Sequence, residues 1–471
     1  MRGLTARVFG VLDRRLEAGT GAPLGVALSG GGDSLALLGL ARAWAGTRGR
    51  RVMAVTVDHG LNPESTAWTA FARRAAERFG AEWRGLVWKG AKPSTGLPAA
   101  ARAARHRLIA EAAREAGCRV VLFGHTADDA DEGERMRAEG GSLGRVREWA
   151  PSPAWPEGRG VFLLRPMLDV SRAELRVWLA EQGLDWIDDP ANEDFRYARA
   201  RVRALSLPPR WGKGGDGGAR ATATQKAHEA PRSPVPPQVR NSRPSAALTL
   251  RPALLASREE GSFFTFPRPA LADPHLLSAA LLCASGGDRP SRGERLERLR
   301  ARLQTPEPFT ATLAGGRVEA GADAALIARD AGETARGGLA PLALSPGVPA
   351  VWDGRFEITT QEPGWTVQPL KGLFAQLGHG DRRVVLALPA AVRPGLPVLA
   401  REGGAGPVPA WRAARVESLA ARRLAAACGV IAHERDIGVP PRGEGTLGAL
   451  CWSSTWPEAR ARTGRGLNEP A

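Results

Sequence analysis

The stretch GVALSGGGDSLALLGL, residues 25–40, decides the fold of the chain. Apolar residues that end a strand run into a glycine-rich turn, and apolar residues then recur at helical spacing. A strand, a tight turn and a helix are therefore expected in succession. Consecutive glycines let the backbone approach a ligand closely, and the free amides of the first helical turn attract anions. The stretch predicts a phosphate site made of Ser29, Gly30, Gly31, Gly32, Asp33 and Ser34.

The acid at position 33 distinguishes this turn from a plain glycine-rich connection, which is the structural alternative. A carboxylate beside a phosphate site is unfavourable unless a divalent cation lies between them, so Asp33 indicates Mg²⁺. The Walker A pattern is absent, because no Lys-Ser or Lys-Thr follows the last glycine. The turn instead matches SGGxDS, the pyrophosphatase loop of enzymes that split ATP into AMP and pyrophosphate. The turn resembles part of an adenylating enzyme rather than a kinase.

Length and charge narrow the class of protein. The 471 residues exceed one usual domain, and a net charge of +16 with a pI near 11.0 favours a polyanionic partner such as RNA. Almost all the basic residues are arginine and the chain is rich in Ala, Gly and Pro. A mutational bias of the genome is therefore an alternative source of part of this charge.

The spacing of the cysteines and the first residues of the chain indicate the cellular compartment. The four cysteines lie far apart without a CxxC pair, which favours neither a disulfide framework nor a metal site. Arg2 and Arg7 interrupt any apolar core of a secretory signal, and no apolar run approaches the roughly 20 residues of a membrane span. We expect a cytoplasmic protein that does not enter membranes.

Strand and helix patterns alternate through the first two hundred residues. Apolar runs at 51–57 and 120–123 are typical of buried strands, and helical spacing recurs at 98–116 and at 172–181 after the capping candidate Ser171. The alternation predicts an α/β, doubly wound, mainly parallel sheet in the N-terminal domain. Ligands of such sheets bind above the carboxyl ends of the strands. Smaller helical or α+β domains are expected to follow.

Composition divides the chain into four ranges. Residues 1–205 form the expected catalytic domain. Residues 206–246 are rich in Gly, Pro, Ser and basic residues and cannot bury enough apolar surface to fold alone, so we expect a disordered linker. Residues 247–335 are expected to form a small helical or α+β middle domain, and residues 336–471 a C-terminal domain.

Local patterns in the C-terminal half predict individual elements but no catalytic spacing. Residues 294–303 have the spacing of a helix, whereas 356–359 and 384–388 resemble short strands. Many prolines separate these pieces. A purely structural role is compatible with the residues of this part of the chain.

The end of the second strand supplies a candidate nucleotide contact. The strand finishes in VDHGLNPES at 57–65, and Asp58 lies where the acid of a Rossmann-type site accepts hydrogen bonds from a ribose. A plain turn is the alternative, because Asp and Gly commonly end strands.

A cluster of acids follows the strand at 120–123. The sequence there is GHTADDADE, and a helix that begins near Thr126 would project several carboxylates from neighbouring turns. Clustered carboxylates can bind Mg²⁺ or hold an ammonium group. The alternative is a capping box with acids in the first helical turn. The candidate ligand-binding residues are His125, Asp128, Asp129 and Glu132.

Five motifs, in this order, resemble the bacterial tRNA(Ile)-lysidine synthetase family. They are SGGGDS at 29–34, VDHGLNPES at 57–65, ARAARHR at 101–107, GHTADD at 124–129 and DDPANEDFRYARARVR at 188–203. The resemblance implies a ligase that uses ATP and Mg²⁺ to adenylate the C2 oxygen of the wobble cytidine in the CAU anticodon of tRNA(Ile). Free L-lysine then attacks that carbon, and AMP leaves.

The resemblance also implies a role for each candidate residue. Residues 29–34 would hold the ATP phosphates, with Asp33 acting through Mg²⁺ and Asp128 as a second candidate metal ligand. Asp58 and His125 would lie in the nucleotide site. The remaining three would act at the reacting centre, where Arg102 steadies the pentavalent phosphorus and two acids, Asp129 and Glu132, hold the incoming lysine.

The chain departs from the family pattern, and rival functions stay open. His106 occupies a position where the family often has Tyr, and the helix after Glu132 is unusually polar. A thiolase-type pyrophosphatase-loop enzyme would need positioned cysteines, and an amidotransferase-type synthetase would need a nucleophile with a histidine partner. A catalytically inactive RNA-binding relative could keep both the charge and the fold.

Overall fold

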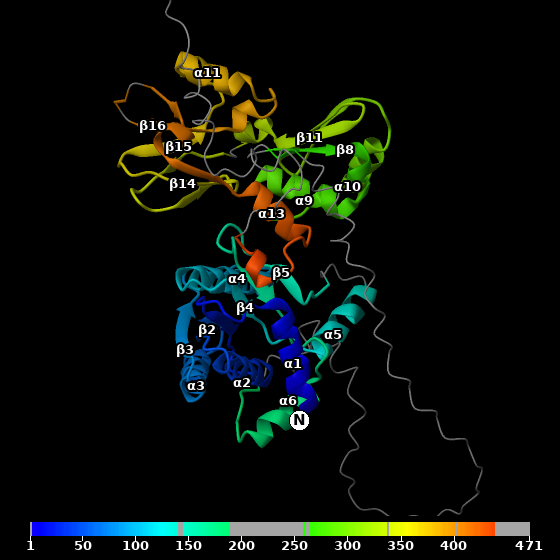
Figure 1. The fold of residues 1–471 in the computed structure, drawn as a ribbon, viewed down its shortest axis with the longest axis vertical. Coiled ribbons are helices and arrows are strands. Elements are labelled where there is room, and N and C mark those ends of the chain that lie inside the picture. Colours follow the sequence, from blue (N-terminus) through cyan, green and yellow to red (C-terminus); the bar gives the residue numbers. More distant parts are fainter. Residues whose placement is uncertain are drawn as a thin grey trace, which may run out of the picture.

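The structure is a computed structural model that describes residues 2–139, 145–188, 258–259, 263–336, 339–401, 403–404 and 406–438 (Figure 1). The expected linker at 206–246 and nearly all of the motif at 188–203 lie outside these residues. An α/β unit formed by the N-terminal part lies at one end of the molecule, and the sheets of the C-terminal part lie at the other. Across the described ranges, no helix combines the length and apolar character that crossing a membrane requires.

The N-terminal unit contains a six-stranded sheet of order β3-β2-β1-β4-β6-β5. Its strands are β1 (Leu24–Ala27), β2 (Val52–Asp58), β3 (Glu82–Val87), β4 (Val120–Leu122), β5 (Trp149–Pro151) and β6 (Phe162–Leu164). Neighbouring strands pair in parallel except β5, which is antiparallel to β6 at the edge. The predicted doubly wound, mainly parallel sheet is confirmed.

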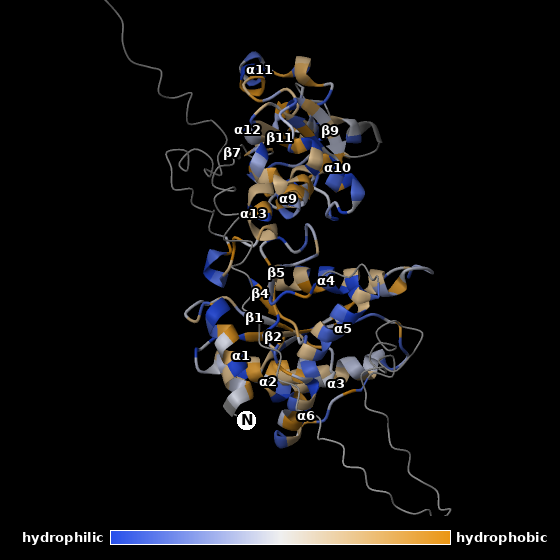
Figure 2. Cartoon of the chain, turned by 90° about the vertical axis from the view of Figure 1, so that its right-hand side faces the viewer, coloured by the Kyte–Doolittle hydropathy of each residue, from blue (hydrophilic) through white to orange (hydrophobic). Residues whose placement is uncertain are grey.

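Helices cover both faces of this sheet. They are α1 (Arg2–Arg15), α2 (Gly32–Gly46), α3 (Ser65–Arg78), α4 (Leu97–Glu115), α5 (Ala127–Ala138) and α6 (Arg172–Glu181). Val52 and Ala54 of β2 join the core beneath α1, α2, α3 and α6, whereas Met53 and Val55 join the core beneath α4. Because both faces are buried, the strands are continuous apolar runs, visible as orange ribbon inside the unit in Figure 2.

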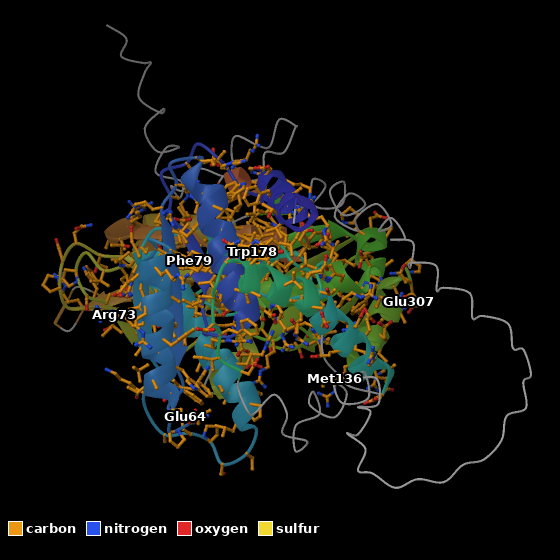
Figure 3. All side chains as sticks on the ribbon, turned by 90° about the horizontal axis from the view of Figure 1, so that it is seen from below. Glu64, Arg73, Phe79, Met136, Trp178 and Glu307 are labelled. Atoms are coloured by element: carbon orange, nitrogen blue, oxygen red, sulfur yellow. The ribbon has the colours of Figure 1, made fainter. Side chains whose placement is uncertain are left out.

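A glycine in α2 lets α6 pack closely against α2. A Cβ at Gly39 would lie 2.6 Å from the Trp178 ring of α6 and 3.0 Å from the Phe79 ring that follows α3. These two aromatic side chains lie side by side in Figure 3. The predicted cap of α6 is confirmed, because Ser171 Oγ accepts a hydrogen bond from the Glu174 amide. The first turn of α6 is thereby held above the loop that precedes α2.

The C-terminal half consists of three antiparallel sheets and five α-helices within the described ranges. The five-stranded sheet contains β7 (Arg258–Glu259), β8 (Phe264–Pro267), β9 (Phe309–Leu313), β10 (Gly316–Ala320) and β11 (Ala324–Arg329). The other two sheets contain β12 (Leu342–Ala343), β15 (Trp365–Pro369), β16 (Pro397–Arg401) and β17 (Val408–Pro409), and β13 (Ala350–Trp352), β14 (Phe356–Thr359) and β18 (Arg415–Ser418). The α-helices are α9 (Pro274–Ser285), α10 (Glu294–Leu303), α11 (His379–Leu386), α12 (Ala410–Ala413) and α13 (Ala420–Ala427).

Two of the three local predictions for this half are correct. The helix at 294–303 and the strand at 356–359 have the predicted bounds. The strand predicted at 384–388 is wrong, because the apolar residues there belong to the end of α11. Only Val385 of this run is buried, which suits one face of a helix better than a strand.

A short segment after α13, residues 430–438, returns to the N-terminal unit, and we call it the return segment. Ile431 and Ile437 join the core of that unit, and the indole N–H of Trp149 donates to the Ile431 carbonyl at 2.8 Å. The Glu434 carboxylate accepts two hydrogen bonds from Arg50, at 2.5 and 2.8 Å, and both side chains are fully buried. The return segment therefore fixes the C-terminal part of the chain to the N-terminal unit.

We expect Glu434→Gln to lower the free energy of unfolding by about 3–5 kcal/mol, because it leaves the buried Arg50 charge without its counter-ion. The matched control is Glu82→Gln, which removes an exposed ion pair with Arg51 and should cost less than about 1 kcal/mol. Urea unfolding of both variants measures the difference. Equal losses in the two variants would contradict the anchoring role of Glu434.

Candidate active site

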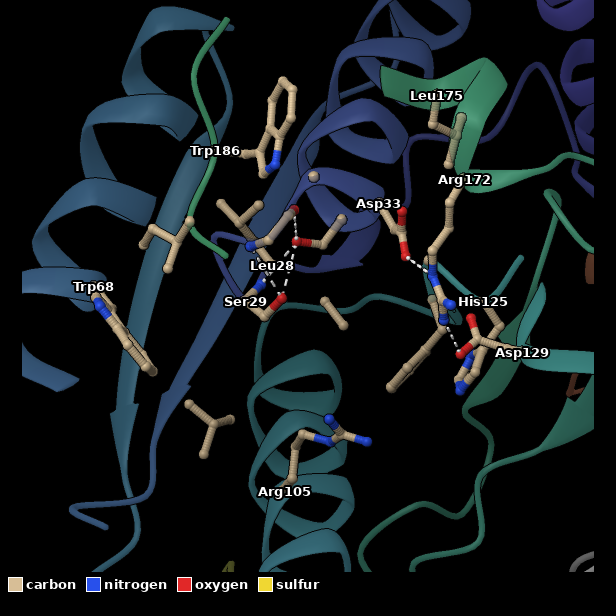
Figure 4. Close-up of a pocket in the computed structure, with 18 of the residues that line it drawn as sticks. Leu28, Ser29, Asp33, Trp68, Arg105, His125, Asp129, Arg172, Leu175 and Trp186 are labelled. Carbon is tan, nitrogen blue, oxygen red and sulfur yellow. Dashed lines mark hydrogen bonds and ion pairs between the residues drawn. The ribbon is translucent and has the colours of Figure 1, made fainter. Parts of the chain in front are cut away.

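A cavity of about 470 Å³ opens at the carboxyl ends of β1, β2 and β4, as the fold predicts. This volume is usual for a small-molecule site. Most of the predicted site residues line it. Those are Ser29, Gly31, Gly32, Asp33, Ser34, Arg102, His125 and Asp129. Figure 4 shows the loop serine at the centre of this cavity, with Trp68 and Trp186 on one side and the acids on the other.

The glycine-rich loop is closed by its own serines. The Ser34 hydroxyl donates to the Gly31 carbonyl at 2.9 Å and accepts from the Ser29 amide at 3.2 Å. The α2 helix begins directly after Gly31, with no side-chain cap. The amides of its first turn therefore lack helical acceptors and give the cavity the partial positive charge that a phosphate requires.

Packing explains two of the glycines in this loop. Gly30 has φ +89°, and a Cβ there would lie 2.9 Å from Ile187 Cδ1. A Cβ at Gly32 would lie 3.4 Å from the Trp186 ring. The Ile187 amide also donates to the Gly30 carbonyl at 3.1 Å. The chain after α6 therefore lies over the loop, and these glycines make room for it.

Three acids, two of which line the cavity, converge on one arginine that the sequence analysis did not identify. Arg172, the first residue of α6, donates from Nη2 to Asp129 Oδ1 at 2.7 Å, from Nη1 to Glu132 Oε1 at 3.0 Å, and from Nε to Asp33 Oδ2 at 3.2 Å. Its backbone N–H donates to Asp128 Oδ2 at 2.9 Å. We call these five side chains the acid cluster. The structure thus brings together all four acids predicted at positions 33, 128, 129 and 132.

Two members of the acid cluster, Asp33 and Arg172, have shifted pKa values. Burial raises the pKa of Asp33, with the neighbouring carboxylates adding to the rise and Arg172 opposing it. Burial acts to lower the pKa of Arg172, but the charges of Asp129, Glu132 and Asp33 outweigh it and raise that pKa. Arg172 is therefore cationic at any physiological pH.

Asp129 serves both interpretations that the sequence left open. Its Oδ2 atom accepts from the Thr126 amide at 2.9 Å and from the Thr126 hydroxyl at 3.2 Å, so it helps to begin α5. Its Oδ1 atom faces Arg172. The acid is a helix-capping residue and a member of the cluster at once.

Asp58, at the end of β2, accepts a hydrogen bond from the Gly60 amide at 2.7 Å, which is the contact of a turn. Its role as a ligand contact stays a prediction.

A basic group lines the same cavity. Arg102 and Arg105 of α4 line it together with His125. Arg165 donates to His125 Nδ1 at 3.2 Å, and burial together with the charges of Arg102 and Arg105 lowers the pKa of Arg165 to about 10. Acids and arginines therefore line the same cavity, so phosphates and an amine that bind there would each find a partner.

The cavity suits ATP and Mg²⁺. Exposed loop amides and arginines suit the phosphates, and carboxylate oxygens are the ligands that Mg²⁺ prefers. Over the described residues, no three His, Cys, Asp or Glu side chains are arranged to hold a metal ion. Mg²⁺ is commonly bound through one or two carboxylates and the substrate phosphates, a role that Asp33 and Asp128 could fill.

Comparison with known proteins places the chain in a family. A family model described as a PP-loop domain matches residues 11–209. The tRNA(Ile)-lysidine synthase of Caulobacter vibrioides is 48% identical over 437 residues, which cover 91% of this chain and 98% of the relative. That of Hyphomonas neptunium is 35% identical over 331 residues, covering 65% and 80%. The chain belongs to the tRNA(Ile)-lysidine synthase family.

Among solved structures, a U34-tRNA thiolase from Methanococcus maripaludis aligns with a TM-score of 0.38 at 19% identity, over 44% of this chain and 71% of that chain. The family predicted from the five motifs is confirmed by the curated relatives. The predicted class of enzyme, an ATP-dependent C–N ligase that modifies tRNA, is confirmed with it.

His106, the departure from the family pattern at the cavity, lies in the core behind the basic group. It is 4% exposed and stacks on Phe123 with ring centroids 5.3 Å apart. Neither ring nitrogen has a hydrogen-bond partner. Burial, together with the charges of Arg105, Arg102 and Arg165, lowers the pKa of His106 to about 3. The ring is therefore neutral and acts as an aromatic core residue.

This pKa predicts a pH-dependent effect of His106→Phe on stability. The unfolded chain binds a proton at His106 below about pH 6.5, whereas the folded chain does so only near pH 3, so wild-type stability falls as the pH falls through this window. Between pH 7.5 and pH 5 the variant should gain about 2 kcal/mol relative to wild type. Urea unfolding at both pH values measures this gain, and the exposed His379→Phe serves as control. Parallel curves for wild type and His106→Phe would refute the assignment.

Proposed function

We propose that this protein converts the wobble cytidine of the CAU anticodon of tRNA(Ile) to lysidine. The C2 oxygen of the base attacks the α-phosphorus of ATP, and pyrophosphate leaves. The amine of free L-lysine then attacks C2, the C–O bond to the phosphate breaks, and AMP carries that oxygen away. The observation that carries the proposal is that acids, arginines and the glycine-rich loop line one cavity.

The loop and the basic group act in the first step. The first-turn amides of α2 and the Arg102 guanidinium would balance the charge that develops on the α-phosphate. Asp33 would hold Mg²⁺, which neutralises the phosphates when bound. His125 lies beside these groups and would contact the nucleotide. The indole rings of Trp68 and Trp186 offer apolar surfaces on the opposite side for the adenine or the cytosine (Figure 4).

The acids act in the second step. Asp129 and Glu132 carry negative charge in a nearly buried position, with 9% and 5% exposure. An ammonium group is drawn to such carboxylates, and its nitrogen must lose a proton before it attacks. The two acids would therefore hold the lysine amine toward C2 and accept or relay that proton.

Cysteine chemistry is disfavoured as an alternative. Cys118, Cys283 and Cys428 are buried, and none of them lines the cavity. Burial raises the pKa of Cys118 to about 12, so it is a poor nucleophile. The hypothesis of a thiolase-type enzyme thus lacks a candidate reactive cysteine among the described cysteines.

The partner and the compartment form part of the proposal. A net charge of +16 suits a tRNA, whose phosphates would lie on the C-terminal part as well as at the cavity. Because ATP, free lysine and tRNA(Ile) are substrates found in the cytoplasm, we propose that the enzyme acts in the cytoplasm.

The proposed function is tested by incubating the purified protein with ATP, Mg²⁺, L-lysine and a CAU tRNA(Ile). Pyrophosphate should be released, and mass analysis of the wobble nucleoside should show cytidine enlarged by a lysine residue. A tRNA with another wobble base is the control. Pyrophosphate release that ignores the identity of the tRNA would contradict the assignment.

We expect Glu132→Gln to raise the KM for lysine by about 10- to 100-fold, because the variant loses one charge-assisted contact to the amine. Pyrophosphate release that depends only on tRNA and ATP should change much less. Glu134→Gln, an exposed acid two positions along α5, is the matched control. A shared defect in both variants, or an unchanged KM in Glu132→Gln, would contradict the role of Glu132.

A further inference from the structure

Arg172 occupies the point where three separate parts of the chain meet. It begins α6, whereas its partners belong to α2 and α5. Three different nitrogens of one guanidinium reach three carboxylates, at 2.7, 3.0 and 3.2 Å. The branched, planar guanidinium can serve three acids at once, whereas a lysine ammonium on its single stem would lose part of this set. The side chain is 18% exposed, so the contacts are shielded from solvent.

The position of Arg172 is fixed from its backbone as well. Its amide donates to Asp128 Oδ2, and the preceding Ser171 caps α6. The packing of Trp178 over Gly39 holds the same helix against α2. Arg172 is therefore held through its backbone and through the packing of α6 as well as through its guanidinium contacts with the acids. Figure 4 shows its side chain reaching from α6 toward Asp33 and Asp129.

The acid cluster can accept additional cations. Three carboxylates contact the Arg172 guanidinium, and the fourth, Asp128, accepts from the Arg172 backbone N–H, so the carboxylates outnumber the cation within the cluster. A divalent cation and one ammonium would add positive charge beside these carboxylates. Arg172 can therefore stay in place while the substrate and Mg²⁺ bind, and the cluster gains charge balance without expelling it.

We propose that Arg172 is a positioning residue for lysine transfer. It holds the Asp129 and Glu132 carboxylates in the orientation that receives the amine, and it ties them to Asp33, which lies beside the phosphates. The distance between amine and phosphate is thereby set by one side chain. This inference rests on the proposed function, in which the two acids of α5 bind lysine.

The test compares Arg172→Ala and Arg172→Lys with wild type in steady-state lysine transfer. We expect Arg172→Ala to raise the KM for lysine at least about tenfold and to lower kcat, and Arg172→Lys to lie between it and wild type, because it keeps the charge but not the three-way contact. Added guanidinium at millimolar concentration should restore part of the activity of Arg172→Ala. The control is Arg7→Gln, which removes an exposed ion pair with Glu174 on the same helix.

Each outcome is decisive. A fall in the KM for lysine would show that Arg172 is a competitor that the substrate displaces, and would overturn the proposal. An unchanged KM, or a loss of activity in Arg172→Ala that guanidinium does not relieve, would overturn it as well. If Arg172→Ala does not fold, Arg172→Lys carries the same comparison of KM. Failure of the proposed function is distinct, because the wild-type protein would then transfer no lysine.

Discussion

Four carboxylates gathered around Arg172 repel one another, and the need to compensate that repulsion organises the site. Arg172 supplies the compensation in the described structure by contacting acids from α2 and α5. The acids themselves are close because two parallel strands end at the same edge of the sheet. Gly124 permits this approach, since a Cβ there would lie 3.1 Å from the Asp33 backbone. Sheet, glycine and arginine together fix the acid cluster.

The same edge of the sheet brings opposite charges into one cavity. Arg102 and Arg105 of α4 line it together with Asp33 and Asp129, so the phosphates and the amine of the proposed reaction would each find a partner there. The return segment adds a second constraint. It ties the C-terminal sheets to the N-terminal unit through a fully buried ion pair.

The helices and strands could be predicted from local sequence patterns. The site residues that depend on contacts between distant parts of the chain could not. The strand, turn and helix at 25–40 and the cap at Ser171 could be predicted, because each depends on neighbouring residues. Arg172 could not, since its contact with Asp33 spans 139 positions and depends on how α6 packs. Gly30 and Gly32 were predicted as ligand contacts, yet their surroundings also require space for Ile187 and Trp186. A sequence motif shows that a glycine is present but not which distant side chain packs against it.

The most direct measurement is an experimental structure of the protein with ATP, Mg²⁺ and lysine bound. The account predicts the lysine amine within about 3 Å of the Asp129 and Glu132 carboxylates, with Arg172 still in contact with both acids. It also predicts the phosphates over the amides that begin α2. An amine bound away from these acids, or Arg172 displaced from them by the substrate, would contradict the account.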